Sequence, residues 1–323
     1  EYSIFFSMAV NPDSFDWPTA DSHLRDERTY LKILSQGGVK QHIPVYMAIA
    51  YACRNLSAKA RGEITSGFLK NWIYVHTRYN LMNELHAGIP DGFAAGKFHG
   101  KLQGKNGWIS ARIHNTIGGK KDIDMTSEVK NGVKNIPLSM EIDEGLGEHH
   151  PWEKDHEYWK DLGKGFAKSA GRTRATTILL LCYERAMHGG GNHSMSYIHG
   201  TEAHFQIEHI LPQSPKNWGS PWHDGSKTKM HEKWINSLGN QILLEDSRNS
   251  HVGNRQFNQK VPKAGCGADC TNPNLHYDGT SFHSAQNIVD YWKDPKTPNK
   301  WGPEAMEHHS IKIMNEVVEF FSP

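Results

Sequence analysis

The most constraining feature of this sequence is a short alternating segment in a chain that otherwise favours helix. Residues 204–212 (HFQIEHILP) alternate as a half-buried strand does, and Pro212 ends the pattern. One face carries Phe205, Ile207, His209 and Leu211. The other face carries Gln206, Glu208 and Ile210. The strand therefore ends with a carboxylate and an imidazole that diverge, which suits one group to hold a metal ion while the other moves a proton.

A second short strand and a helix are expected after a long connection. Residues 238–244 (LGNQILL) form an apolar segment that is entered through a Gly-Asn turn. The sequence DSRNS at 246–250 is typical of a helix start with Asp246 or Ser247 as the N-cap, and we expect that helix to continue to Lys260. The predicted order is strand, strand, helix, with polar side chains where the first strand ends and the helix begins.

Much of the remaining chain has the three-to-four spacing of apolar residues that is typical of helices. We expect helices over residues 21–34, 43–53, 64–85, 152–166, 172–187, 284–292 and 303–321. The last of these has Pro303 in its first turn and an apolar face made of Met306, Met314, Val317, Val318 and Phe321. The predicted fold class is mainly α-helical, with a small embedded strand–strand–helix module.

Composition excludes several classes of protein. Lys and Arg total 36 against 35 Asp and Glu, so the net charge is +1 and any affinity for nucleic acid must come from local patches. The apolar run at 177–182 is far too short to cross a membrane, so we expect no membrane association of that kind. Cys53 and Cys182 stand alone in apolar helical sequence, as in a reducing compartment, which predicts a cytoplasmic protein. The chain begins without Met or a signal-peptide pattern, so we expect it to be a piece of a longer polypeptide.

A basic, glycine-rich segment at residues 92–121 contains no acidic residue. Its Lys and Arg residues are Lys97, Lys101, Lys105, Arg112, Lys120 and Lys121. Two interpretations stay open: a solvated loop whose charge has no function, or a surface that follows DNA phosphates, since aromatic residues are interleaved with the cations. Arg255 and Lys260 are further candidates for phosphate contacts, although a solvated helix face explains them equally well.

Two cysteines and two histidines near the C-terminal end are candidate ligands for a structural zinc ion. They are Cys266, Cys270, His276 and His283. A CxxxC pair with two later histidines has the composition of a tetrahedral zinc site. The spacing is not a standard one, and loops rich in Gly and Asn collect cysteines by chance, so the zinc interpretation is the less favoured one.

The strand–strand–helix segment resembles the ββα-metal (HNH) nuclease motif. The resemblance rests on EHILPQ at 208–213, LGN at 238–240 and NS at 249–250. It is greatest to the C-terminal nuclease domain of GmrSD-type modification-dependent restriction enzymes, including the SspE-like nickases that sense phosphorothioated DNA. Asn254, Phe257, Lys260 and the helix that starts near Trp301 and Glu304 also match that family. The resemblance is specific across residues 204–260 and loose across 150–323.

The resemblance implies a role for each matching residue. His209 would be the general base that deprotonates the attacking water, and Asn240 would hold the strand and His209 in orientation. Glu208 would be the acidic metal ligand, although many family members have Asp at this position, which puts the reach of the longer side chain in doubt. Asn249 would be the second ligand, from the helix, and Asn254 stays open as an alternative. One Mg²⁺ or Mn²⁺ ion suits such oxygen ligands.

We therefore expect a mostly helical segment over residues 1–150 and an HNH nuclease domain over 151–323, with its core at 204–260 and helices after it. The implied function is a metal-dependent DNA endonuclease of an anti-phage restriction system, with nicking as the simplest activity. In such systems the partner is an N-terminal domain that senses modified DNA and hydrolyses nucleotide, and nothing in this chain resembles it. The alternative is a catalytically silent DNA-binding or protein-interaction module of the same system.

Overall fold

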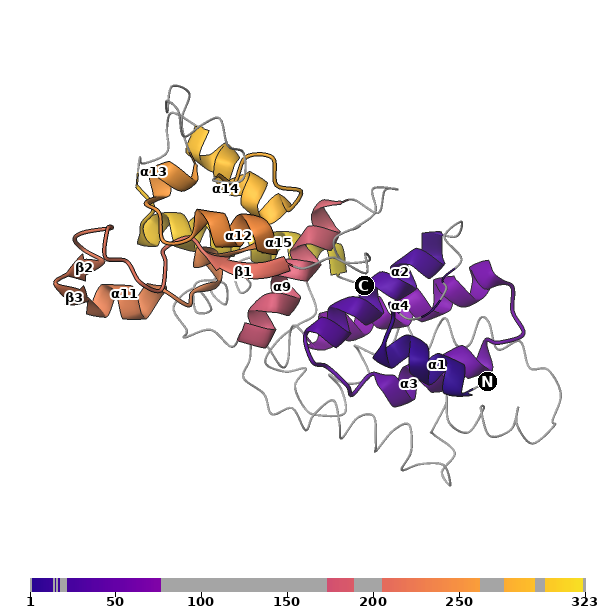
Figure 1. The fold of residues 1–323 in the computed structure, drawn as a ribbon. Coiled ribbons are helices and arrows are strands. Elements are labelled where there is room, and N and C mark those ends of the chain that lie inside the picture. The colour runs from indigo at the N-terminus through magenta and orange to yellow at the C-terminus, as the bar shows by residue number, and fades with distance from the viewer. Residues whose placement is uncertain are drawn as a thin grey trace, which may run out of the picture. The chain divides into compact units, whose positions relative to one another are not determined.

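The computed structural model describes residues 2–13, 15, 17, 22–76, 173–188, 205–261, 276–293 and 300–321. These residues are mostly helical, with small antiparallel pairs of strands (Figure 1). The chain divides into two compact units, one made of Glu1–Asp155 and Phe321–Pro323 and the other of His156–Phe320. The predicted helix at 152–166 and the basic segment at 92–121 lie outside the described residues. No helix of the described residues has the length and apolar character needed to cross a membrane.

The first unit contains four described helices: α1 (Tyr2–Val10), α2 (Ser22–Gln36), α3 (Ile43–Ala52) and α4 (Ala58–His76). Their apolar faces form a core in which Leu31 and Phe68 are fully buried. A buried carboxylate also joins two of the helices, because Tyr46 Oη donates a hydrogen bond of 2.7 Å to Glu27 Oε1. The helices expected over residues 21–34 and 43–53 are present, and α1 is an additional one. The helix expected over 64–85 begins earlier, at Ala58, and residues 77–85 of that prediction lie outside the described residues.

The second unit is built around one antiparallel strand pair. Strand β1 (Phe205–His209) pairs with β4 (Gln241–Glu245) in a register that places His209 opposite Gln241. Helix α12 (Asp246–Val252) begins directly after β4 and contacts both strands (Figure 1). In the sequence, β1 and β4 are separated by the short antiparallel pair β2 (His223–Asp224) and β3 (Ser226–Lys227), helix α11 (Lys229–Trp234) and the 3₁₀ turn η3 (Leu238–Asn240).

The sequence expectations for the helix after β4 are wrong at both ends, and its N-cap is Glu245 rather than Asp246 or Ser247. The helix that begins at Asp246 does not continue to Lys260, because Gly253 follows Val252 with a φ of 50°, in the left-handed region that a glycine adopts readily. A separate short helix, α13 (Phe257–Lys260), follows the resulting turn. It begins with a capping box in which Gln256 and Gln259 satisfy each other's backbone N–H groups.

Helices α9 (Thr173–Met187), α14 (His283–Lys293) and α15 (Pro303–Phe321) complete the second unit. Aromatic side chains fill the core that α14 and α15 share with α13: Phe257 stacks on Trp301 at 5.0 Å between ring centroids and meets Trp292 edge-on at 4.6 Å. The η3 turn approaches α15 so closely that a Cβ atom on Gly239 would lie 1.7 Å from the Met306 carbonyl oxygen. Glycine is therefore required at this contact.

A buried carboxylate joins α9 to the start of α14. The two oxygens of Glu184 accept hydrogen bonds from the backbone N–H groups of His283 (2.7 Å) and Ser284 (2.8 Å). These N–H groups belong to the first turn of α14, where no partner is available within the helix. The hydroxyl oxygen of Ser284 in turn accepts a hydrogen bond of 3.2 Å from the backbone N–H of Leu243 in β4. Hydrogen bonds of Glu184 and Ser284 thus link β4, α9 and α14.

Candidate active site

The chain leaves β1 through a segment whose backbone is held by the side chain of Asn240. Asn240 Oδ1 accepts hydrogen bonds from Leu211 N (2.7 Å) and Trp301 Nε1 (3.1 Å). Its Nδ2 donates to the carbonyl oxygens of Leu211 (3.0 Å) and Ile235 (2.8 Å). The amide is fully buried and uses every hydrogen-bonding position that it has. Residues 210–211, directly after His209, are therefore fixed against η3, and Trp301 holds the Asn240 amide in place.

Lys260 of α13 holds the same stretch of backbone from another direction. Its Nζ lies 2.5 Å from Glu208 Oε1, 3.2 Å from the His209 carbonyl oxygen and 3.1 Å from the Ile210 carbonyl oxygen. An ammonium group has three N–H donors, so all three are used. Tyr277 adds a second donor to the same carboxylate oxygen, with its Oη 3.1 Å from Glu208 Oε1.

Burial governs the electrostatics of this ion pair. Loss of water raises the pKa of the Glu208 carboxyl, and the nearby Lys260 ammonium and Tyr277 hydroxyl offset part of that shift. Loss of water likewise lowers the pKa of Lys260, against the attraction of Glu208. Three acceptors around Nζ and two donors at Oε1 match the charged forms of both groups, so we describe the contact as a buried salt bridge.

His209 is half-buried beside this pair. Burial lowers the pKa of its imidazole, a hydrogen bond with the Asn236 side chain opposes the shift, and the charges of Lys260 and His231 add to it. The imidazole is therefore neutral at neutral pH, which is the form that can accept a proton. His231 also contacts the exit from β1, with its Nε2 2.9 Å from the Pro212 carbonyl oxygen.

Asn249 faces β1 from helix α12. Its Nδ2 donates a hydrogen bond of 2.8 Å to Oε1 of Gln206, which lies two residues before Glu208 and on the same face of the strand. The amide oxygen Oδ1, the atom that would ligate a cation, has no hydrogen-bond partner among the described residues. Asn254 is exposed in the turn after α12, so it is not a helix residue.

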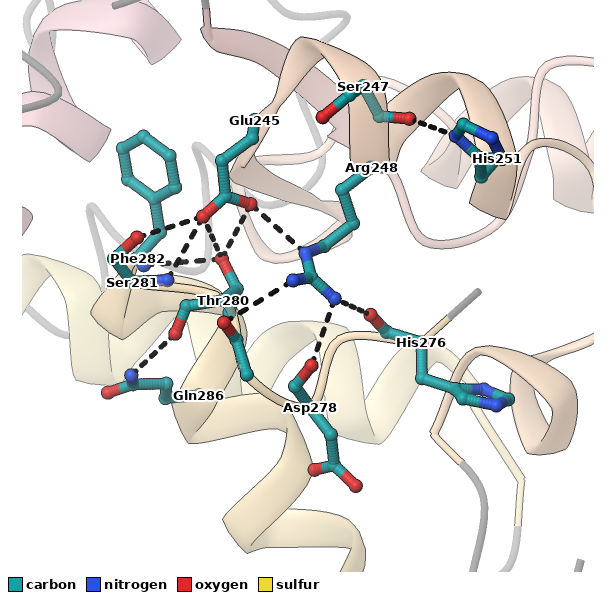
Figure 2. A network of polar contacts seen from close by, with 11 residues as sticks. Glu245, Ser247, Arg248, His251, His276, Asp278, Thr280, Ser281, Phe282 and Gln286 are labelled. Carbon is teal, nitrogen blue, oxygen red and sulfur yellow. Dashed lines mark hydrogen bonds and ion pairs between the residues drawn. The ribbon is translucent and has the colours of Figure 1, made fainter. Parts of the chain in front are cut away.

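A second polar network fixes the start of α12, as Figure 2 shows. Glu245, at the end of β4, accepts hydrogen bonds from Thr280 Oγ1 (3.1 Å), from Ser281 N and Oγ (3.1 and 2.9 Å) and from Arg248 Nε (3.2 Å). Partial burial raises the pKa of Glu245, but the hydrogen bonds from Ser281 and the Arg248 charge outweigh it and lower the pKa overall. The guanidinium of Arg248 donates to the carbonyl oxygens of His276 (2.7 Å) and Asp278 (2.9 Å). Helix α12 is thereby tied to the segment before α14.

The remaining sequence candidates are distributed as follows. Lys260, a candidate for phosphate contact, is fully buried in the salt bridge and does not reach the surface. Arg255 is half-exposed. The candidates outside the described residues are Lys97, Lys101, Lys105, Arg112, Lys120, Lys121, Cys266 and Cys270.

The two histidines suggested for zinc have other contacts. His276 Nδ1 lies 2.8 Å from the Gln259 carbonyl oxygen, and His283 Nε2 lies 3.3 Å from His188 Nδ1. In the part of the chain that the structure describes, no three His, Cys, Asp or Glu side chains are grouped closely enough to share a metal ion.

Comparison with protein families adds the decisive observation. Residues 152–315, which are 164 of the 323 residues, match the family described as GmrSD restriction endonucleases, C-terminal domain. This chain belongs to the GmrSD restriction endonuclease family. The matched range contains β1, β4, α12, α13 and the whole set of contacts around Glu208. A search of curated proteins found no match.

Several side chains of this GmrSD-family site carry no signal in the sequence. Tyr277 binds Glu208 across 69 residues of sequence, and Asn236 contacts His209 from the irregular segment before η3. The contacts of Lys260 with the carbonyl oxygens at the end of β1 were equally unforeseen. A lysine on a short polar helix is normally solvated, and only its partner 52 residues earlier explains its burial.

Proposed function

We propose that this chain is a metal-dependent DNA endonuclease that nicks its substrate, with His209 as general base and Glu208 and Asn249 as metal ligands. The observation that carries the proposal is the arrangement at the end of β1. His209 leaves the strand at a point where Asn240 and Lys260 hold the following backbone, Glu208 precedes it, and Asn249 faces the same strand from α12. Membership in a family of restriction endonucleases supports DNA as the substrate.

The donor atoms of the site match a hard divalent cation. Glu208 offers a carboxylate and Asn249 an amide oxygen that is not engaged within the described residues, and Mg²⁺ and Mn²⁺ prefer oxygen ligands of this kind. Few protein ligands are typical of Mg²⁺ sites, in which water and phosphate complete the coordination. Such an ion would stabilise negative charge on the scissile phosphate and on the leaving oxygen.

The side chains of this chain would supply positioning and proton transfer. The neutral imidazole of His209 takes the proton from the attacking water. Asn240 and Lys260 fix the backbone on the C-terminal side of His209, which limits the directions in which its ring can point. Asn249 is held toward β1 by Gln206, and the Glu245–Arg248 network fixes the helix that carries it.

A catalytically silent DNA-binding or protein-interaction module is the second candidate. The observation in its favour is that one oxygen of Glu208 already has two donors, Lys260 and Tyr277, as a purely structural carboxylate would have. In that case His209→Ala and Asn249→Ala would leave the function of the protein unchanged.

Conversion of supercoiled plasmid to the open circle tests the proposal. The purified chain is incubated with Mg²⁺ or Mn²⁺, beside His209→Ala, a sample with EDTA, and His223→Ala as a matched histidine control on β2. We expect open circle from the wild type and from His223→Ala, a loss of about 100- to 10,000-fold in His209→Ala, and none with EDTA. Product that survives in His209→Ala or in EDTA, or no product with either metal, would contradict the proposal.

Binding of Mn²⁺ separates the two candidate asparagines. Electron paramagnetic resonance measures the free Mn²⁺ that remains in the presence of the wild type, Asn249→Ala and Asn254→Ala. Because Asn249 faces β1 and Asn254 is exposed in the turn after α12, we expect weaker binding in Asn249→Ala alone. Equal binding by all three proteins would exclude Asn249 as a ligand.

A further inference from the structure

A hollow of about 450 Å³ opens in the second unit, near the starts of α13 and α15. Its wall comes from residues 218–222, from the first residues of α13 and from residues 300–303. Sites for small molecules and cofactors commonly have volumes of 300–1,000 Å³, so this hollow has the size of a ligand site. None of the residues to which we have assigned a catalytic or metal-binding role lines it.

Aromatic side chains form the inner wall of the hollow. Trp218 is half-buried, while Trp222, Phe257 and Trp301 are almost fully buried behind it. Trp218 Nε1 donates a hydrogen bond of 3.1 Å to the Arg255 carbonyl oxygen, which fixes the plane of its ring. Phe257 and Trp301 are fixed by their mutual stacking. The wall is therefore a preformed surface for a flat apolar ligand.

The rim of the hollow carries a positive charge and a hydrogen-bonding amide. Lys300 and Asn258 are exposed there, and among the described residues that line the hollow none is acidic. The Asn258 amide has no hydrogen-bond partner among the described residues, so both its donor and its acceptor are available. A cation and an amide beside an aromatic wall are suited to a ligand that combines a negative charge, a flat ring and hydrogen-bonding edges.

Two residues of the hollow's wall are linked to the candidate active site. Trp301, in the wall, donates to Asn240 Oδ1, and Asn240 holds the backbone after His209. Phe257, also in the wall, lies on the same short helix as Lys260, which binds Glu208. A ligand in the hollow would therefore rest on the residues that position the exit of β1.

We propose that this hollow binds one nucleotide of the DNA substrate, with its base against Trp218 and its phosphate beside Lys300. Bases stack on aromatic side chains with little dependence on sequence, and lysine supplies the electrostatic contact with the backbone. The proposal rests on the proposed function only in taking DNA as the substrate, and it assigns a separate contact with that substrate.

Matched variants of Trp218 test the stacking contact. Trp218→Phe and Trp218→Leu both lose the hydrogen bond to Arg255, but only the phenylalanine keeps an aromatic face. Binding of a short fluorescein-labelled single-stranded oligothymidylate is measured by fluorescence anisotropy in EDTA, where no metal supports cutting. We expect roughly tenfold weaker binding by Trp218→Leu than by Trp218→Phe. Equal affinities would overturn the proposal, provided that both variants unfold at the same temperature.

Lys300 tests the phosphate contact independently of the core. Lys300→Ala is compared with Lys227→Ala, another exposed lysine, which lies on β3 outside the hollow. We expect Lys300→Ala alone to weaken binding and to reduce the slope of log affinity against log salt by about one. Identical salt slopes in the two variants would overturn the proposal.

Plasmid nicking separates this proposal from the proposed function. If the wild type does not nick but Trp218→Leu and Lys300→Ala bind DNA weakly, the nucleotide site stands and the nuclease proposal fails. If the wild type nicks and both variants bind as their controls do, the nucleotide site fails and the nuclease proposal stands.

Discussion

Lys260 Nζ lies 2.5 Å from Glu208 Oε1 in a fully buried salt bridge between residues 52 positions apart. The contact joins the end of β1 to α13 and places a positive charge against the carboxylate that precedes His209. The other two N–H groups of Lys260 bind the carbonyl oxygens of residues 209 and 210. The lysine therefore balances the charge of Glu208 and also fixes the backbone that follows it. Its consequences can be measured in stability as well as in activity.

Lys260→Met should destabilise the second unit by about 3–5 kcal/mol, because it leaves the Glu208 carboxylate buried without its counter-charge. Tyr277→Phe removes one neutral donor from the same oxygen and should cost only about 1 kcal/mol. The double variant Glu208→Leu/Lys260→Met should recover most of the loss, because neither charge remains. Urea unfolding measures all three. A double variant as unstable as Lys260→Met would show that the salt bridge is not the source of the effect.

Asn240→Ala should lower plasmid nicking by about 100-fold, because the backbone after His209 loses the amide that positions it. It should also lower the free energy of unfolding by at least about 3 kcal/mol. Four hydrogen bonds are lost, and the carbonyl oxygens of Leu211 and Ile235 stay buried without this partner. Trp301→Phe is the matched control, since it removes one of the four bonds and keeps an aromatic ring. Initial rates are compared at a temperature where both variants are folded. If the control loses as much activity as Asn240→Ala, the amide does not position His209.

Gly239→Ala should destabilise the protein by about 3 kcal/mol or more, because the new methyl group overlaps the backbone of Met306 and forces η3 away from α15. Gly67→Ala is the opposite case: the glycine lies within α4 and its added Cβ meets no atom within 4 Å. That substitution should stabilise the helix by about 0.5–1 kcal/mol. Thermal unfolding measures both, and a neutral Gly239→Ala would contradict the close approach.

Glu184 should make stability fall as the pH rises. Burial raises the pKa of its carboxyl to about 7 in the folded protein, against hydrogen bonds from Ser284 and His283, while an unfolded glutamate titrates near 4.5. Between these values the folded state binds more protons than the unfolded state, so the free energy of unfolding decreases as the pH rises. The contribution of Glu184 to this decrease is roughly 3 kcal/mol in all, and it is constant above the folded pKa.

Urea unfolding of the wild type and of Glu184→Gln across that pH range isolates this contribution, because all other groups titrate alike in the two proteins. The difference in the free energy of unfolding between the wild type and Glu184→Gln should change between pH 4.5 and about pH 7. Parallel curves for the wild type and Glu184→Gln would contradict the raised pKa.

Much of the helical fold could be predicted because its signals are local. The spacing of apolar residues indicated α2, α3, α9, α14 and α15, and the alternation at 204–212 indicated β1. The break between α12 and α13 could not be predicted in the same way. A single glycine inside a helical pattern is often tolerated, and only the φ of Gly253 shows that it ends the helix.

The candidate site was predictable where the residues are close in sequence and unpredictable where they are not. Glu208 and His209 stand together at a strand end, so a pattern could find them. The partners that fix them, Lys260 and Tyr277, lie 52 and 69 residues from Glu208, and lysine is a residue type that usually occurs at the surface. Their role depends on tertiary packing, for which the sequence offers no periodicity.

The bond between Glu184 and the first turn of α14 spans about a hundred residues. At a synthesis rate of about 5–20 residues per second, α9 leaves the ribosome roughly 5–20 seconds before the N–H groups that it will bind. During that interval its apolar surface, including Leu180 and Leu181, has none of its final neighbours from α14 or β4. Any attempt to excise the second unit should therefore begin before Thr173, because a shorter piece would leave the start of α14 without its acceptor.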